Sequence, residues 1–330
     1  DDIDFRARIS SDEEAAFLAA VVAGRPLGPT YADLDAAPAV VLVGFEPEDE
    51  SPIVFLRLRR AARATGTRVL GVSARHTRGL HKMDGQWVPC QPGAEGQLLR
   101  SALDGADDHG LAAALREPGA VLLVGERLAA VPGALSAAAA LSAATGAALG
   151  WVPRRAGERG ALDAGAVAGL LPGGRSISDP QARIDVAGVW GVSPDELPRY
   201  PGRRGTAAIC HAVTPSSPAS NLPVQATVDA EEVPATALVI AGVEPADDPA
   251  RETLLAACEG PAFVVALATH HSEVTERADV VFPVAVVAEK AGSFTDWEGR
   301  VRTFGPAIRD AQTLPDGRVL AMIADAMDAP

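Results

Sequence analysis

Two short motifs of the same residue types, Gly44-Phe45-Glu46-Pro47 and Gly242-Val243-Glu244-Pro245, are the most regular chemical feature of the sequence. Each follows an apolar run, and each leads into acidic residues and then a proline before the next helical pattern. A glycine lets the backbone approach a ligand closely, and a proline fixes the turn that follows it. Such a loop at the end of a buried strand could bind a nucleotide, or it could serve only as a tight turn.

The acidic residues beside both motifs argue against a phosphate ligand. Glu46 is followed by Glu48-Asp49-Glu50, and Glu244 is followed by Asp247-Asp248. A phosphate needs cationic groups or a free helix N-terminus, whereas nearby carboxylates repel it. The residues by themselves therefore favour structural turns over nucleotide sites.

The histidines and cysteines do not form a recognisable metal or catalytic motif. His270 and His271 are adjacent, and in an extended chain their side chains point in different directions, which makes a poor chelate. Cys90, Cys210 and Cys258 are far apart and form no CxxC pair, so a disulfide scaffold, a zinc site and an iron–sulfur site are not expected in this chain. The sequence also lacks a nucleophile elbow, a P-loop and a GxGxxG fingerprint.

A second group of candidate ligands is basic. His76 and His81 lie in one loop with three further cationic residues, Arg75, Arg78 and Lys82. These five side chains could line a small anion pocket. The alternative, which we favour, is a solvated basic patch.

Length, composition and charge exclude several classes of protein. The 330 residues, 48% of them hydrophobic, suit two domains of roughly 150 residues each. A net charge of −14 repels phosphate backbones, so a nucleic-acid partner is not expected. No apolar run reaches the roughly 18 residues that a membrane span needs, so direct membrane insertion is not expected either. Because the chain begins at Asp1 without methionine, we interpret it as a fragment of a longer polypeptide.

The order of apolar runs and turn residues predicts an α/β fold. Short buried strands alternate with amphipathic helices. Strands are predicted at 40–43, 68–72, 121–124, 237–241, 263–267 and 280–282, and helices at 15–22, 53–64, 97–103, 132–145 and 314–327. Ser11 and Glu14 form a capping-box pattern, and Asp248 is predicted to cap a helix that has Pro249 at its first position.

Two segments remain outside this alternation. Residues 151–175 are rich in Gly, Arg and Pro and are predicted to connect two domains. Residues 289–300 are predicted to form a hairpin or lid that is packed by Phe294 and Trp297. The repeated Gly-x-Glu-Pro motif indicates two related α/β lobes, and ligands of such sheets bind at the carboxyl ends of the strands, where both motifs lie.

Two long stretches resemble the molybdopterin oxidoreductase family. Residues 40–103 are similar to the first dinucleotide lobe of that family, with Gly44, Pro47, Pro52 and Pro92-Gly93 at matching places. Residues 237–304 are similar to its return lobe. This second stretch contains Gly242, Pro245, the run from Thr275 to Pro283 and, as the most specific signal, the run from Glu289 to Arg300. Outside the two stretches, Trp190-Gly191, Leu197-Pro198 and Pro201-Gly202 also fit the family.

The resemblance implies two Rossmann-like α/β lobes of the formate dehydrogenase-like fold, one inserted in the other. The inserted lobe is expected at 36–150, and the second lobe at 1–35 together with 151–330. The two Gly-x-Glu-Pro loops would then face each other across a shared cleft.

Within the family, the chain is most similar to the branch found in bacterial respiratory complex I, NADH-quinone oxidoreductase, whose members keep the fold without the molybdenum cofactor. The departures from the family pattern agree with this. Glu46 and Glu244 stand where the family has Asn before the proline. Ser10 falls where many members have a cysteine or selenocysteine metal ligand. Some active members use serine there, so Ser10 does not by itself exclude a metal, and a helix start at Ser10 and Ser11 is the simpler interpretation.

The complex I resemblance implies a structural, cofactor-free portion of a proton-translocating NADH:quinone oxidoreductase. No catalytic or metal-binding residue is expected. The vestigial cleft would consist of Ser10, Gly44, Glu46, Pro47, Gly242, Glu244 and Pro245. The parent polypeptide would carry 2Fe-2S and 4Fe-4S clusters N-terminal to Asp1. Its partners would be the other hydrophilic subunits of complex I, on the cytoplasmic side of the bacterial plasma membrane.

Two alternatives remain open at this point. The chain could be part of an active molybdopterin oxidoreductase such as a formate dehydrogenase, with Ser10 as a metal ligand. It could also be an unrelated nucleotide-binding α/β module.

Overall fold

The chain folds into two compact units. The computed structural model describes residues 2–25, 28–213, 235–309 and 312–329. Unit 1 comprises Asp1–Ile9, Gly165–Ser293 and Thr303–Pro330, and unit 2 comprises Ser10–Ala164 and Phe294–Arg302. The lobe boundaries predicted from sequence, at 36 and 150, were drawn from repeated motifs rather than from contacts and stay a prediction.

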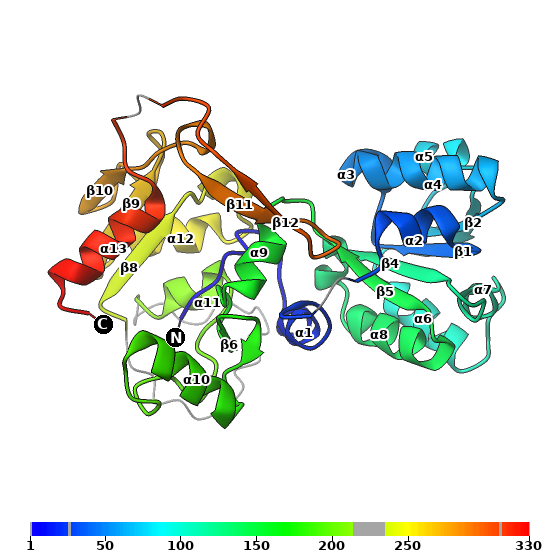
Figure 1. Ribbon diagram of the computed structural model, residues 1–330, viewed down its shortest axis with the longest axis horizontal. Coiled ribbons are helices and arrows are strands. Elements are labelled where there is room, and N and C mark those ends of the chain that lie inside the picture. The colour runs from blue at the N-terminus through cyan, green and yellow to red at the C-terminus, as the bar shows by residue number, and fades with distance from the viewer. Residues whose placement is uncertain (1, 26–27, 214–234, 310–311, 330) are drawn as a thin grey trace. The chain divides into compact units, whose positions relative to one another are not determined.

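Unit 2 is built on a five-stranded parallel sheet in the order β3-β2-β1-β4-β5 (Figure 1). The strands are β1 (Ala39–Val43), β2 (Arg68–Ser73), β3 (Gln86–Pro89), β4 (Val121–Gly125) and β5 (Ala148–Val152). This order is that of a doubly wound, Rossmann-like sheet. Every residue of β1 is buried, as expected for a central strand that is covered on both faces.

Helices cover both faces of this sheet. Figure 1 shows α2 (Tyr31–Ala36), α3 (Pro47–Glu50), α4 (Pro52–Ala64) and α5 (Arg78–Lys82) on one side, and α6 (Glu95–Leu103), α7 (Leu111–Leu115) and α8 (Ala134–Thr145) on the other. The remaining elements of unit 2 are α1 (Asp12–Phe17), the π-helix η1 (Leu18–Val22), the 3-10 helix η2 (Glu126–Ala130) and α9 (Glu158–Asp163). The α2–α5 layer packs its apolar side chains on alternate residues of the strands, such as Val40 and Leu42.

Unit 1 has a smaller parallel sheet in the order β10-β9-β8. Its strands are β8 (Ala237–Ala241), β9 (Phe263–Ala268) and β10 (Val280–Pro283), and the helices α11 (Thr206–His211) and α12 (Arg251–Cys258) share a buried core with it. Helix α13 (Asp316–Ala326) packs Val319 against Leu267 of β9. The other elements of unit 1 are β6 (Leu170–Leu171), β7 (Arg175–Ser176), α10 (Pro180–Trp190), and the 3-10 helices η3 (Pro245–Asp247) and η4 (Val287–Glu289).

The segment predicted as a hairpin or lid is a two-stranded hairpin of β11 (Gly292–Thr295) and β12 (Val301–Phe304). The backbone N–H of Asp296 donates to the carbonyl oxygen of Arg300 at 3.0 Å, which closes the turn. Trp297, at 8% exposure, is buried in the core of unit 2, a contact that the sequence did not predict. Phe294 is 36% exposed, so it is only partly buried, and its packing within the hairpin stays a prediction.

The predicted α/β class is confirmed, and so are the six strands, whose observed ends lie within one residue of those predicted. The Ser11 side chain accepts a hydrogen bond from the backbone N–H of Glu14 at 3.2 Å and so caps α1. No helix among the described residues combines the length and the apolar character needed to cross a membrane.

Two local predictions need correction. Residues 151–175 are not one connection, because Trp151 and Val152 complete β5 and the rest contains α9, β6 and β7. Gly150 interrupts the apolar pattern of β5, so the sequence did not predict this strand. Gly150 is a packing residue, since a Cβ there would lie 2.8 Å from Leu123. Asp248 accepts a hydrogen bond from the Ala250 N–H at 2.7 Å, but α12 begins at Arg251 rather than at Pro249.

Candidate functional site

The first Gly-x-Glu-Pro loop lies at the carboxyl end of β1, as predicted. Gly44 has a φ of +60°, a conformation that favours glycine, and Pro47 begins α3. The Glu46 carboxylate accepts a hydrogen bond from the backbone N–H of Glu48 at 3.3 Å. The Glu50 carboxylate accepts from the backbone N–H of Glu46 at 3.1 Å. The loop therefore satisfies two of its own backbone donors with its own carboxylates.

A buried leucine occupies the space beside Gly44. A Cβ built on Gly44 would lie 2.6 Å from the Cγ of Leu128, which is 1% exposed. The Nε of Arg127 donates to the Gly44 carbonyl oxygen at 3.1 Å. A dinucleotide loop uses its glycine for close approach of the ligand. In this chain, the Leu128 side chain of the same unit occupies the space beside the glycine.

Cations of the same unit pair with two of the acidic residues after Gly44, Glu48 and Glu50. The Glu50 side chain is nearly buried and lies 3.0 Å from an Arg127 nitrogen and 3.3 Å from the Nε of Arg154. Glu48 forms an ion pair with Lys82 of α5. The first loop is thus closed by internal hydrogen bonds and ion pairs, and it does not fit a diphosphate.

The second loop follows β8 in unit 1 and is more open. Gly242 has a φ of +62°, and a Cβ there would meet no atom within 4 Å. Glu244 is partly exposed, and its carboxylate lies 3.5 Å from the Nε2 of His270. Pro245 begins η3. A hollow of only ≈ 40 Å³ borders this loop, far below the roughly 300 Å³ at which pockets for small organic ligands begin.

Ser10 lies two residues before α1 and is half-buried. Ser11, rather than Ser10, provides the helix cap. The described residues contain no group of three or more His, Cys, Asp or Glu side chains arranged to hold a metal ion. Of the seven residues predicted for the cleft, Ser10, Gly44, Glu46 and Pro47 belong to unit 2, and Gly242, Glu244 and Pro245 belong to unit 1.

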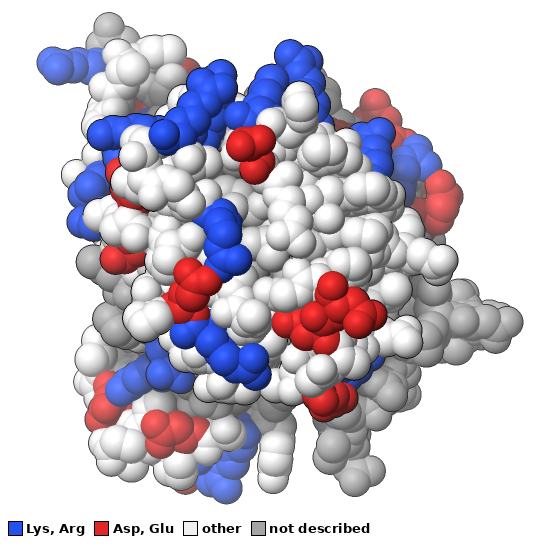
Figure 2. All heavy atoms as spheres, turned by 90° about the vertical axis from the view of Figure 1, so that its right-hand side faces the viewer, with Lys and Arg blue, Asp and Glu red and all other residues white. Residues whose placement is uncertain are grey.

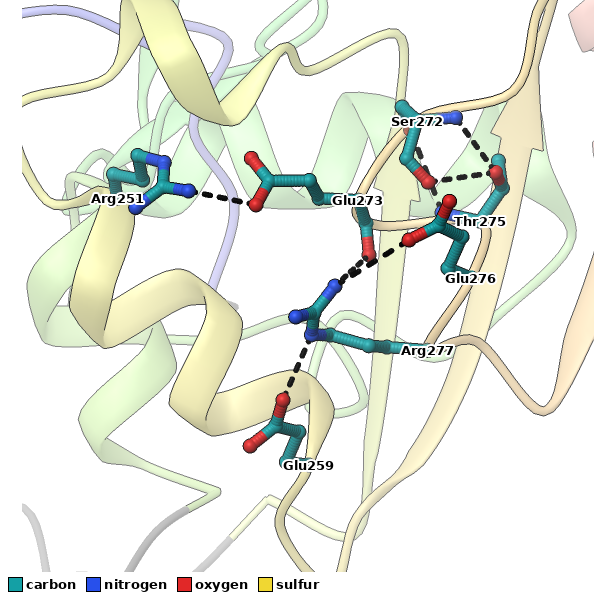
Figure 3. Close-up of polar contacts among 7 residues, drawn as sticks. All are labelled: Arg251, Glu259, Ser272, Glu273, Thr275, Glu276 and Arg277. Carbon is teal, nitrogen blue, oxygen red and sulfur yellow. Dashed lines mark hydrogen bonds and ion pairs between the residues drawn. The ribbon is translucent and has the colours of Figure 1, made fainter.

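Ion pairs hold the polar loop after β9 against α12 (Figure 3). The Arg251 guanidinium contacts the Glu273 carboxylate at 2.6 Å, and the Nε of Arg277 contacts the Glu259 carboxylate at 2.8 Å. These hydrogen bonds raise the pKa of both guanidinium groups. The interactions tie the loop to α12.

Reciprocal hydrogen bonds within the same loop form a tight turn. The backbone N–H of Ser272 donates to the Thr275 hydroxyl at 2.8 Å, and the backbone N–H of Thr275 donates to the Ser272 hydroxyl at 3.4 Å. Asp279 accepts a hydrogen bond from the Val264 N–H of β9 at 2.7 Å. The polar groups of this loop therefore form hydrogen bonds that stabilise the fold.

The basic loop around His76 is an exposed surface. The His76 ring stacks on Trp87 at 6.3 Å between ring centres, and it meets His81 edge-on at 5.8 Å. Lys82 is engaged with Glu48, and Arg75 and Arg78 are exposed. This arrangement favours the basic patch over an anion pocket.

A hollow of ≈ 280 Å³ lies at the end of β3 in unit 2, where no site was predicted. It is lined by Cys90, Leu98 and Asp107 among others. Burial, with the nearby charge of Glu95, raises the pKa of the Cys90 thiol to about 11. Asp107 accepts hydrogen bonds from the N–H groups of Leu111 and Ala112 at 2.7 and 2.8 Å, so its carboxylate caps α7. The Pro92-Gly93 turn was the only sequence signal near this hollow.

Comparison with known proteins places the chain in a family. Residues 4–312 match the family model described as molybdopterin oxidoreductase. The chain is 52% identical over 330 residues to the NADH-quinone oxidoreductase G subunit of Mycobacterium bovis, in a match that covers 99% of this chain and 38% of the relative. It is 49% identical to the G subunit of the same enzyme from Streptomyces coelicolor, covering 99% of this chain and 39% of the relative. The chain thus spans well under half the length of these relatives.

Among solved structures, acetylene hydratase from Pelobacter acetylenicus has the same fold. The TM-score is 0.58 at 12% identity, and the match covers 96% of this chain and 50% of that protein. At this identity the likeness concerns the fold alone. The family match over most of the sequence, together with the shared fold, shows that the chain belongs to the molybdopterin oxidoreductase family.

Proposed function

We propose that this chain is the structural, cofactor-free portion of the G subunit of complex I. It would support electron transfer from NADH to quinone through iron–sulfur clusters held elsewhere in the polypeptide. The assignment is supported by NADH-quinone oxidoreductase G subunits that are 52% and 49% identical to it over nearly the whole chain. The observation that carries the cofactor-free role is the first loop, where Glu46 and Glu50 occupy backbone donors and Leu128 covers Gly44.

The energetics of that loop oppose a pterin dinucleotide. Two like unit charges ~4 Å apart near a protein surface repel by about 4 kcal/mol. A diphosphate bound at this loop would be repelled in the same sense by Glu46, and it would also have to displace hydrogen bonds to carboxylates, worth roughly 1.5–3 kcal/mol each. Moving Leu128 out of its buried position adds a further cost. These unfavourable contributions support an empty first half-site.

The same proposal covers partners and location. The chain would contact the other hydrophilic subunits of complex I at the cytoplasmic face of the bacterial plasma membrane, held there by the complex. The parent polypeptide would carry 2Fe-2S and 4Fe-4S clusters, and this portion would have no catalytic residue. The vestigial residues would be Ser10 and the first Gly-x-Glu-Pro loop in unit 2, and the second loop in unit 1.

Metal and pterin analysis of the intact purified complex tests the proposal. We expect iron and acid-labile sulfide in stoichiometric amounts, and neither molybdenum nor extractable pterin. A molybdenum-dependent oxidoreductase prepared from the same cells serves as the control for extraction. Stoichiometric molybdenum with pterin, or formate-dependent dye reduction by the complex, would instead support the enzyme alternative, with Ser10 as the metal ligand.

A further inference from the structure

In one segment of this acidic chain, all of the charged residues are basic. Between Ser51 and Met83 there is no Asp or Glu, while the rest of the chain has 43 acidic residues against 21 basic ones. The segment carries eight basic residues: Arg57, Arg59, Arg60, Arg63, Arg68, Arg75, Arg78 and Lys82. Most of them lie on or beside the helices α4 and α5.

Helices α4 and α5 lie together on unit 2. Lys82 of α5 is positioned over the Phe55 ring of α4, at 5.8 Å from its centre. Figure 1 places both helices at the top of this unit, and Figure 2 shows Lys and Arg side chains gathered along the upper edge of its outer face. The positive charge is therefore collected on one surface.

The outward face of α4 combines arginines with large apolar side chains. Ile53 and Leu56 are 52% and 53% exposed, and Arg60 and Arg63 follow on the same stripe at helical spacing. The opposite face of the helix is buried in the core. We call the outward residues Ile53, Leu56, Arg60 and Arg63 the α4 surface.

Internal carboxylates neutralise only part of this charge. Three of the eight cations form ion pairs: Arg57 with Asp35, Arg68 with Glu117, and Lys82 with Glu48. Among the described residues, the other five have no carboxylate within ion-pair distance: Arg59, Arg60, Arg63, Arg75 and Arg78. Like charges held together in this way repel one another and attract an anionic partner.

We propose that the α4 surface binds an acidic segment of another protein, one that carries apolar side chains beside its carboxylates. Arginine is enriched in protein interfaces, and it pairs with carboxylates through two parallel hydrogen bonds. Ile53 and Leu56 distinguish the partner class. Apolar side chains gain from burial against apolar groups of a protein, whereas a phosphate backbone offers them nothing.

The charge of the rest of the chain also disfavours a nucleic acid. With 43 acidic residues outside this segment, a long polyanion that reached beyond the α4 surface would be repelled. A short acidic protein segment fits within the basic area. The inference rests on the proposed function only in requiring that the chain works in an assembly with other proteins.

A binding experiment with the full-length polypeptide tests the charge requirement. The probe is a fluorescent helical peptide of Glu and Leu, compared with a Lys and Leu peptide of the same pattern. We expect binding of the Glu–Leu peptide alone, weakened by salt, and weakened at least about tenfold by the double variant Arg60→Glu/Arg63→Glu. The control Arg116→Glu/Arg318→Glu makes the same charge change at two other exposed arginines and should bind normally.

The apolar requirement is tested separately. Leu56→Ser should weaken binding of the Glu–Leu peptide and leave binding of a single-stranded oligonucleotide unchanged. Absence of peptide binding, equal losses in the arginine control, or tighter binding of the oligonucleotide than of the peptide would overturn the proposal.

Photo-crosslinking in the assembled complex identifies the natural occupant. A photoreactive amino acid replaces Leu56, or Ala113 on the exposed side of α7 as a control, and the crosslinked peptide is sequenced. We expect an Asp- and Glu-rich peptide with apolar residues, captured from Leu56 only and lost with Arg60→Glu/Arg63→Glu. Capture of a basic peptide, a lipid or a nucleic acid would contradict the proposal. Because none of these measurements depends on molybdenum, their failure is distinguishable from failure of the proposed function.

Discussion

Leu128 lies so close to Gly44 that any side chain at residue 44 would collide with it, since a Cβ there would be 2.6 Å from the leucine Cγ. The loop after β1 is packed at this point like a protein interior. The consequence is measurable, because stability and not ligand affinity should respond to changes at these two residues.

Gly44→Ala should therefore be strongly destabilising. The left-handed φ of +60° and the overlap with Leu128 together should lower the free energy of unfolding by about 2–4 kcal/mol. The matched control is Gly66→Ala, at φ +77° with no atom within 4 Å of the new Cβ, which should cost about 1 kcal/mol. Urea unfolding of the three proteins measures the difference.

A double variant isolates the contact itself. Leu128→Ala alone should cost about 2–5 kcal/mol because it leaves a cavity. In Gly44→Ala/Leu128→Ala the new methyl group enters that cavity, so the combined loss should be smaller than the sum by about 0.5–3 kcal/mol. Additive losses would show that the two residues do not interact.

Removing the glutamate of each Gly-x-Glu-Pro motif should not create a cofactor site. In Glu46→Asn/Glu244→Asn one carboxylate that would repel a diphosphate is gone from each loop, and asparagine still suits the cap position of α3. Leu128 continues to cover Gly44 in this variant. Pterin fluorescence that co-elutes with the protein in gel filtration would contradict this expectation.

The buried pair of Asp4 and Arg6 should make unit 1 sensitive to acid. Their closest side-chain atoms are 2.6 Å apart, and both side chains are almost fully buried. Burial alone would raise the pKa of Asp4, but the hydrogen bonds and charge of Arg6, with the N–H of Gly205, lower it below its ordinary value of 3.8. A depressed carboxyl pKa stabilises the fold above that value, and the stability is lost as pH falls through the native pKa.

Asp4→Asn is the corresponding test. Removing one partner of a buried ion pair costs about 3–5 kcal/mol near neutral pH. The urea midpoint of the wild-type protein should fall below about pH 4, and the gap between the two proteins should narrow there. A gap that stays constant down to low pH would show that Asp4 does not titrate as described.

Trp297 should contribute far more than Trp190 to the free energy of unfolding. Trp297 is 8% exposed in the core of unit 2, and Trp190 is 51% exposed on α10. Trp297→Ala should lower the free energy of unfolding by about 3–5 kcal/mol. Trp190→Ala should change it by no more than about 0.5 kcal/mol. Comparable losses in chemical denaturation would refute the role of the hairpin in the core.

The three thiols should be nearly inert in the native protein. Burial raises the pKa of Cys90 to about 11 and that of Cys210 to about 12, and it also raises the pKa of Cys258. At pH 8 the reactive thiolate of Cys90 would be about a hundredfold scarcer than that of an ordinary cysteine. A disulfide reagent should label Ala113→Cys rapidly and the native cysteines only after denaturation. Rapid labelling of the unaltered protein would count against this account.

Local patterns in the sequence predicted most helices and strands, but they could not predict contacts between residues that are far apart in the sequence. The apolar run at residues 40–43 and the cap at Ser11 depend on neighbouring residues, so both could be found. Strand β5 was missed because Gly150 is required by packing against Leu123 of another strand. Leu128 and Gly44 are likewise brought together only by the sheet order. The acidic character of the first loop was visible, but its internal hydrogen bonds and ion pairs were not.

The hairpin has a consequence for how the polypeptide is made. Unit 2 includes residues 10–164, yet its core also needs Trp297, and Glu298 accepts a hydrogen bond from the backbone N–H of Tyr31 at 2.5 Å. Domains fold as units while the ribosome releases the chain. Residues 10–164, which make up most of unit 2, therefore remain without Trp297 and Glu298 until the hairpin has emerged, with most of unit 1 already outside the ribosome. For the same reason, a gene fragment that encodes residues 10–164 alone would specify an unfinished domain.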